Sequence, residues 1–210
     1  MLTRRLILAS AGATAALGVL PAAAAAERDN PMPEDLRKSL ERDPTAPVLG
    51  NGDGNITLSE FFDYNCPYCR KMVPLMSQLV REDPQLRLVH REWPVFGADS
   101  EFAAKASLAS LKQGKYWQLH AALMTMEGRA EEASVMRIAR QVGLDEARLR
   151  EDMQGPDPER HVTMSFLLGD HMGLRGTPSF ICGDEVVFGE MDLQELRDLV
   201  ARGRQTLGVV

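Results

Sequence analysis

Cysteine is scarce in this sequence. The 210 residues include three cysteines, at positions 66, 69 and 182. Small secreted domains that depend on disulfides for stability carry a larger, even number of cysteines at regular spacings. The odd count therefore excludes a disulfide-stabilised scaffold, and two cysteines only three positions apart point instead to redox or metal chemistry.

An excess of positive charge is also lacking. The chain has 24 Lys and Arg against 30 Asp and Glu, a formal net charge of -6, and it has no basic run outside the extreme N-terminus. Nucleic-acid binding generally needs a basic surface, so charge gives no reason to expect such a partner. Internal repeats are absent too, and a chain of this length favours one compact domain with room for an inserted subdomain.

The first 26 residues are typical of a secretory signal peptide. A positive start, Thr3-Arg4-Arg5, precedes an apolar, uncharged stretch from Leu6 to Leu20 and then a run of small residues ending at Ala26. This order predicts cleavage near Ala26 and a periplasmic or secreted protein, exported by the general or the twin-arginine route. A membrane anchor is the alternative, but an apolar stretch of about 15 residues is short for a bilayer. Cleavage would leave 22 basic and 30 acidic residues, a net charge of -8.

Residues 27–47 are expected to form a flexible leader, because they are polar and contain four prolines. One short helix, Glu34 to Glu41, fits between the proline pairs. After a turn cluster at 50–55, alternating residues predict a strand from Ile56 through position 62. A helix should follow from about Pro67 to Arg81, and then a strand over Leu86 to Trp93.

The hydrophobic period changes between residues 99 and 175, where helical spacing continues with no clear strand. Two short β runs follow, Ser179 to Cys182 and Glu185 to Phe188, joined by the two-residue turn Gly183-Asp184. A last helix is expected from about Asp192 to Arg202. The prediction is an α/β fold, with a sheet domain built from residues 48–98 and 176–210 and an inserted α-helical domain at 99–175.

The two close cysteines form the motif Cys66-Pro67-Tyr68-Cys69. Cys66 falls where a strand ends and a helix begins, so unsatisfied N–H groups and the positive helix end favour its thiolate. Pro67 suits the first helical position. We therefore predict Cys66 as the exposed nucleophile with a depressed pKa, and Cys69 as the more buried thiol that resolves mixed disulfides.

Metal binding by the same pair is the alternative. A structural zinc site needs about four ligands, and the sequence offers no second C-x-x-C or paired histidines at metal spacing. If a metal bound, two thiolates with few imidazoles would favour Cu(I) over zinc. Disulfide exchange needs no separate cofactor, because the disulfide itself carries the electrons.

Glu60 is the second candidate site residue. It lies six positions before Cys66 and shares a predicted strand face with apolar residues. A carboxyl buried there would have a raised pKa and could exchange protons with Cys69. The alternative is that Glu60 lies at a solvated edge or pairs with Arg87 or Arg91. The histidines give no catalytic signal: His120 and His171 are expected to be packed or hydrogen-bonded, and His90 faces either the sheet or water.

The segment Phe61-Phe62-Asp63-Tyr64-Asn65-Cys66-Pro67-Tyr68-Cys69, with Gly176-Thr177-Pro178-Ser179-Phe180 downstream, resembles the DsbA family of thioredoxin-fold proteins. The resemblance covers the chain from Ala46 onward. It implies a thioredoxin-like fold with an inserted helical domain, a cis Pro178 that faces the cysteines, and a Thr177 backbone free to pair with a client peptide. Family members also carry a glutamate near the position of Glu60.

The resemblance implies a periplasmic protein thiol–disulfide oxidoreductase. Its partners would be reduced or misoxidised secreted proteins and a membrane redox partner that resets the cysteine pair. The strongest oxidases of the family have Pro-His between the cysteines, whereas this chain has Pro67-Tyr68, so a milder oxidant or a disulfide isomerase stays open. Isomerases of this type generally need oligomerisation, for which the leader is short. Cys182 has no role in the motif and is expected to be a buried inert thiol, a regulatory partner being the alternative.

Overall fold

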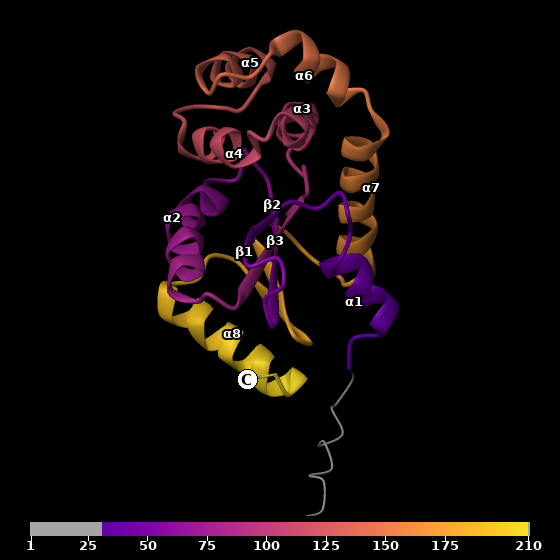
Figure 1. Ribbon diagram of the computed structural model, residues 1–210, viewed down its shortest axis with the longest axis vertical. Helices are drawn as coiled ribbons and strands as arrows, with labels where there is room; N and C mark the ends of the chain where they lie inside the picture. The colour runs from indigo at the N-terminus through magenta and orange to yellow at the C-terminus, as the bar shows by residue number, and fades with distance from the viewer. Residues whose placement is uncertain (1–30, 210) are drawn as a thin grey trace, which may run out of the picture.

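A five-stranded sheet forms the centre of the computed structural model, which describes residues 31–209 (Figure 1). The predicted signal peptide lies outside the described residues. The strands are β1 (Val48–Gly50), β2 (Ile56–Phe62), β3 (Leu86–Glu92), β4 (Ser179–Cys182) and β5 (Glu185–Phe188). Their order is β1-β3-β2-β4-β5, with β2 and β3 parallel and every other pair antiparallel. β2 is therefore the middle strand, with neighbours on both sides.

Helices account for most of the remaining chain. They are α1 (Glu34–Glu41), α2 (Pro67–Glu82), α3 (Ala98–Ala109), the 3-10 helix η1 (Ser110–Gln113), α4 (Tyr116–Thr125), α5 (Glu132–Gln141), α6 (Glu146–Met153), α7 (Pro156–His171) and α8 (Leu193–Leu207). Among the described residues, no helix is long and apolar enough to cross a membrane.

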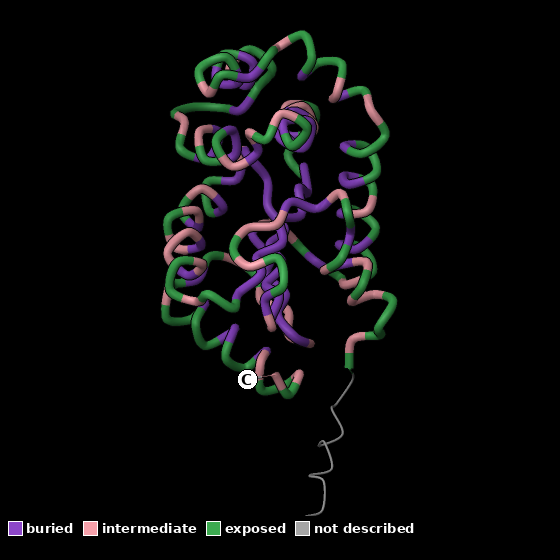
Figure 2. Tube along the Cα trace, in the orientation of Figure 1, coloured by how far each residue is buried: buried purple, intermediate pink, exposed green. Residues whose placement is uncertain are grey.

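The sheet is buried on both faces, and every residue of β2 and β3 is buried (Figure 2). Helices α2 and α8 cover the face that carries Ile56 and Leu58, whereas α1 and α7 cover the face that carries Phe61 and Ile181. A strand with both faces covered holds few polar side chains unless they have partners. Each charged residue of β2 and β3 therefore needs a buried partner or a functional reason to be there.

The predicted helical insertion is confirmed, since α3 to α7 lie between β3 and β4 with no strand among them. Helices α3 to α6 stack beyond the end of β2, where their core includes Phe62 and Tyr64 as well as both close cysteines. Helix α7 differs, because it runs back alongside the sheet and contacts β3. The fold is a thioredoxin-like α/β sheet with helices inserted between its strands, as predicted.

From Met32 onward the predicted flexible leader, 27–47, packs against the sheet domain. Helix α1 has the predicted bounds, and its Leu40 is fully buried against the sheet. Arg37 donates to the main-chain O of Gly183 at 2.9 Å, and Asp43 pairs with the buried Arg91 at 3.0 Å. The prolines and polar composition of the segment gave no sign of these contacts. They depend on one apolar helix face and one buried ion pair, whose partners lie far along the chain.

Candidate active site

Cys66 occupies the junction between β2 and α2. It is the N-cap residue of α2, with Pro67 in the first turn, and its Sγ accepts a hydrogen bond from the main-chain N–H of Cys69 at 3.4 Å. The pKa of Cys66 is lowered to about 6 despite burial. The largest cause is hydrogen bonding from the Cys69 thiol, and the main-chain N–H groups of Cys69 and Tyr68 add to it. A helix start supplies unpaired donors that stabilise a negative sulfur. The predicted position and electrostatics of Cys66 agree with the structure.

The prediction that Cys66 is exposed is wrong for this thiol form. The residue is 1% exposed, whereas Tyr68 is 52% exposed. The cause is the loop before β4: the Cys66 thiol donates to the main-chain O of Thr177 at 3.2 Å. The sulfur lies between exposed Pro67 and Tyr68 on one side and half-buried Thr177 on the other. An incoming disulfide therefore has to approach between these two segments.

Cys69 lies one helical turn deeper and is fully buried. Burial, followed by its hydrogen bond and proximity to Cys66, raises the pKa of the Cys69 thiol. The two thiols thus differ in pKa in the direction that disulfide exchange requires, with a stabilised thiolate at Cys66 and a protonated thiol at Cys69.

The loop that touches Cys66 contains a cis peptide bond between Thr177 and Pro178, as the family resemblance implied. The Ser179 hydroxyl donates to the main-chain O of Gly176 at 2.6 Å and closes the loop, after which β4 begins. No acceptor for the main-chain N–H of Thr177 occurs among the described residues. That N–H group is consequently available to an extended peptide laid across the cysteine pair.

Glu60 lies in the middle of β2, on the face toward α2, and is buried. Burial, and then the negative charges of Cys66 and Glu92, raise the pKa of Glu60 to about 8. The nearest charged partner is His90, whose Nε2 lies 3.5 Å from Glu60 Oε2. A cavity of about 180 Å³ between α2 and α4 reaches both side chains.

The alternatives for Glu60 are wrong. The strand is central, so Glu60 has no solvated edge, and neither arginine contacts it. Arg87 donates to the main-chain O of Glu41, and Arg91 pairs with Asp43 on the opposite face. A buried carboxyl without a cation is an expensive arrangement, which fits a proton-exchange role beside Cys69.

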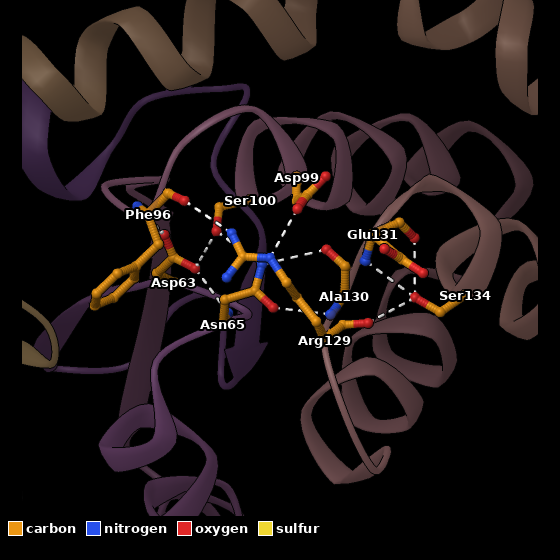
Figure 3. A network of polar contacts seen from close by, with 9 residues as sticks. All are labelled: Asp63, Asn65, Phe96, Asp99, Ser100, Arg129, Ala130, Glu131 and Ser134. Carbon is orange, nitrogen blue, oxygen red and sulfur yellow. Dashed lines mark hydrogen bonds and ion pairs between the residues drawn. The ribbon is translucent and has the colours of Figure 1, made fainter.

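A polar clamp ties the loop before Cys66 to the helical block (Figure 3). The Asn65 side chain donates to the main-chain O of Ala130 at 3.2 Å and accepts from its N–H at 2.8 Å, and it also donates to Ser100 Oγ. Asp63 accepts from Ser100 Oγ at 2.7 Å and from the N–H of Phe96 at 3.0 Å. The clamp fixes the backbone that presents Cys66, and it was not predicted from the sequence.

Arg70 strengthens the same connection from α2. Its guanidinium donates to the main-chain oxygens of Tyr64, Met126 and Gly128. The only sequence signal was the position of Asp63, Asn65 and Arg70 directly around the cysteine motif, because their partners in the helical block lie 33 or more residues away.

Cys182 does not join the site. It is buried in β4 beside Gly203 of α8, and burial raises its pKa to about 12. It is buried as expected, in a different part of the core from Cys66 and Cys69. Among residues 31–209, no group of three or more His, Cys, Asp or Glu side chains is arranged to hold a metal ion.

Comparisons with known proteins agree with this geometry. A family model for the DSBA-like thioredoxin domain matches residues 57–201. A crystal structure of a thioredoxin-like oxidoreductase from Silicibacter pomeroyi is 50% identical, covers 80% of this chain and 98% of that chain, and has a TM-score of 0.79. The thiol-disulfide exchange protein alpha-DsbA2 from Wolbachia pipientis is 29% identical over 80% of this chain and 92% of that chain, with a TM-score of 0.74. A periplasmic thioredoxin-like protein from Salmonella enterica is 25% identical, covers 82% of this chain and 97% of that chain, and has a TM-score of 0.72.

Curated relatives include the Na(+)/H(+) antiporter NhaA 3 of Salinispora tropica, 26% identical over 151 residues. The match covers 71% of this chain but only 23% of that protein. The chain thus spans about a quarter of the length of these curated relatives, and the similarity concerns one part of them.

Proposed function

The chain belongs to the family of DSBA-like thioredoxin domains, and from that premise we propose that it exchanges disulfides with secreted client proteins outside the cytoplasm. It is a thiol–disulfide oxidoreductase whose redox pair is Cys66 and Cys69. The observation that carries the proposal is the asymmetry of this pair. Cys66 caps the start of α2 beneath the Thr177 loop, and its pKa is lowered to about 6, whereas Cys69 lies one turn deeper and its pKa is raised.

The oxidising reaction proceeds in two displacements. A client thiolate attacks Cys66 in the disulfide form, the bond between Cys66 and Cys69 breaks, and Cys69 leaves as a thiolate that takes a proton from Glu60. A second client thiolate then attacks the client sulfur of the mixed disulfide. Cys66 leaves as a stabilised thiolate, and the client has lost two electrons that the cysteine pair has gained.

The client segment binds across the loop of Thr177 and Pro178. The unpaired N–H of Thr177 and the exposed ring of Tyr68 flank Cys66, so an extended client could add main-chain hydrogen bonds on one side and apolar contact on the other. A membrane redox partner would then reoxidise the reduced pair. The pattern of residues 1–26 and the periplasmic Salmonella relative support an extracytoplasmic location.

The direct experiment offers the oxidised protein reduced ribonuclease and follows the return of ribonuclease activity. Cys66→Ser should abolish activity, and Cys69→Ser should abolish it too, because neither variant can form the internal disulfide. Offered scrambled ribonuclease instead, Cys69→Ser should accumulate a mixed disulfide through Cys66, whereas Cys182→Ser should behave as the parent protein in both assays. Full activity of Cys66→Ser would overturn the proposal. Scrambled ribonuclease in a parallel assay distinguishes an isomerase from an oxidase.

A reduction potential measured against glutathione sets the direction of exchange. We expect a value between about -120 mV, typical of the strongest oxidases, and about -270 mV, typical of reductants. The alternative of a copper-binding thiol protein is disfavoured because the raised pKa of Cys69 opposes its ionisation as a ligand. Tight Cu(I) binding with no client oxidation would favour that alternative.

A further inference from the structure

A chain of buried polar side chains leads away from Glu60 into the helical insertion. His90 Nε2 lies 3.5 Å from Glu60 Oε2, and its Nδ1 lies 3.3 Å from the hydroxyl of Tyr116 in α4. That hydroxyl donates to Glu92 Oε1, and Glu92 Oε2 lies 2.9 Å from Nε2 of His161 in α7. All five side chains are almost completely shielded from solvent. The chain therefore connects the residue behind Cys69 to two inserted helices.

The chain places a second carboxyl close to Glu60. Glu60 pairs with His90 and Phe62 pairs with Glu92 in the parallel register of β2 and β3, so the two glutamates occupy the same face of neighbouring strands. Like charges in one buried site oppose each other's ionisation. Glu92 accordingly contributes to the raised pKa of Glu60, after burial and Cys66.

Within residues 31–209, no lysine or arginine forms an ion pair with either carboxyl. Arg91 lies on the opposite face, paired with Asp43. Burial lowers the pKa of His90 well below its ordinary value and lowers that of His120 to about 4, so both stay neutral at physiological pH. Titratable groups surround Glu60 on three elements. They are Cys66 at the cap of α2, Cys69 within α2, His90 and Glu92 of β3, and Tyr116 and His120 of α4.

We propose that Glu92 is a positioning residue for disulfide exchange, which acts through Tyr116 and His90 to set how tightly Glu60 holds its proton. Glu92 contacts neither the sulfurs nor a client, and its effect is on the group that serves Cys69. The inference rests on the proposed role of Glu60 as the proton partner of Cys69. His161 belongs to the same device, since it contacts the second oxygen of Glu92.

The affected step is resolution of a mixed disulfide by Cys69. The Cys69 thiol transfers its proton to the ionised carboxylate of Glu60, its sulfur attacks Cys66, and the foreign thiolate leaves as the bond between Cys66 and Cys69 forms. The electron pair leaves with the foreign sulfur, and the enzyme pair is oxidised. If Glu60 holds its proton more tightly, it becomes ionised only at higher pH. Glu92 therefore raises the pH at which this step becomes fast.

The test follows resolution with a chromogenic aromatic disulfide. Reduced protein releases one coloured thiolate when Cys66 attacks the reagent and a second when Cys69 resolves the mixed disulfide. The rate of the second release, plotted against pH, reports the ionisation of Glu60. We expect Glu92→Gln to move the midpoint of this profile about one pH unit or more toward acid, because an amide keeps the contact with Tyr116 but removes the charge.

The matched control is Asp152→Asn. Asp152 is largely buried, at 14% side-chain exposure, and is ion-paired with Lys112, but it lies in the helical block away from Glu60. This variant should leave the midpoint of the second release unchanged. The first release should keep its own pH dependence in both variants, since Cys66 governs it.

Glu60→Gln separates the inference from the proposed function. Loss of the titration in Glu60→Gln, with an unshifted midpoint in folded Glu92→Gln, would overturn the role of Glu92 alone. An unchanged profile in Glu60→Gln would instead overturn the role of Glu60. If Glu92→Gln does not fold, Tyr116→Phe gives the same information, because it removes the hydroxyl that joins Glu92 to His90. The carboxyl ¹³C signal of Glu60 should then titrate at a different pH from the wild-type signal, and an identical Glu60 curve would refute the coupling.

Discussion

Replacing Glu60 by glutamine should stabilise the reduced protein, and the gain should grow with pH. The pKa of Glu60 rises from 4.5 to about 8 on folding, first because burial disfavours the carboxylate. Below the unfolded pKa both states hold the proton, and the glutamate costs little. Between the two pKa values only the folded state holds it, so the free energy of unfolding falls by about 1.4 kcal/mol per pH unit. Above about pH 8 the loss levels off.

The expected size follows from this window. From about pH 5 to about pH 8, wild type should lose on the order of 3 kcal/mol that Glu60→Gln retains. Urea denaturation of both proteins at several pH values measures the difference. Glu151→Gln, a change at an exposed residue of α6, controls for loss of one acid. The gain should shrink in the oxidised protein, which lacks the Cys66 thiolate that also raises the pKa of Glu60.

Parallel stability profiles for wild type and Glu60→Gln would refute the reasoning. They would mean that water entering the cavity between α2 and α4 solvates the carboxylate, so that burial imposes no penalty. A gain at low pH that vanishes at high pH would contradict the sign of the shift.

Two further changes test the packing around the site. Asn65→Ala should cost about 1 to 3 kcal/mol of stability in urea denaturation, because it leaves the main-chain groups of Ala130 unpaired; an unaffected unfolding midpoint would show that the clamp does not hold the loop. Gly203→Ala should cost a similar amount, about 1 to 3 kcal/mol, since its Cβ would lie 2.5 Å from Cys182 Sγ. Cys182→Ala in the same chain should recover part of that loss, and a strictly additive double mutant would contradict the proposed clash.

Local patterns were sufficient to predict the elements of the sheet. Period-two alternation gave β2, the Gly183-Asp184 dipeptide gave the hairpin of β4 and β5, and the proline pairs gave α1. These features are encoded by neighbouring residues, so the sequence is enough to find them. The strand β1 was missed because three residues pairing with β3 leave no periodicity.

Contacts between distant segments were not predictable in the same way. Cys66 was expected to be exposed, yet the loop of Thr177, 111 residues later, covers it. Arg91 was considered a partner for Glu60, but strand alternation places it on the opposite face, where Asp43 of the leader pairs with it. The polar chain through Glu92 and Tyr116 likewise forms only when the helical insertion folds over β3.

The central claim is that Cys66 is ionised at neutral pH. The ultraviolet absorbance of the thiolate, measured against pH for the reduced protein and for Cys66→Ser, tests it most directly. We expect a titration with a midpoint near pH 6 that disappears in Cys66→Ser. A midpoint at or above about 8.5, the value of an ordinary thiol, would contradict it.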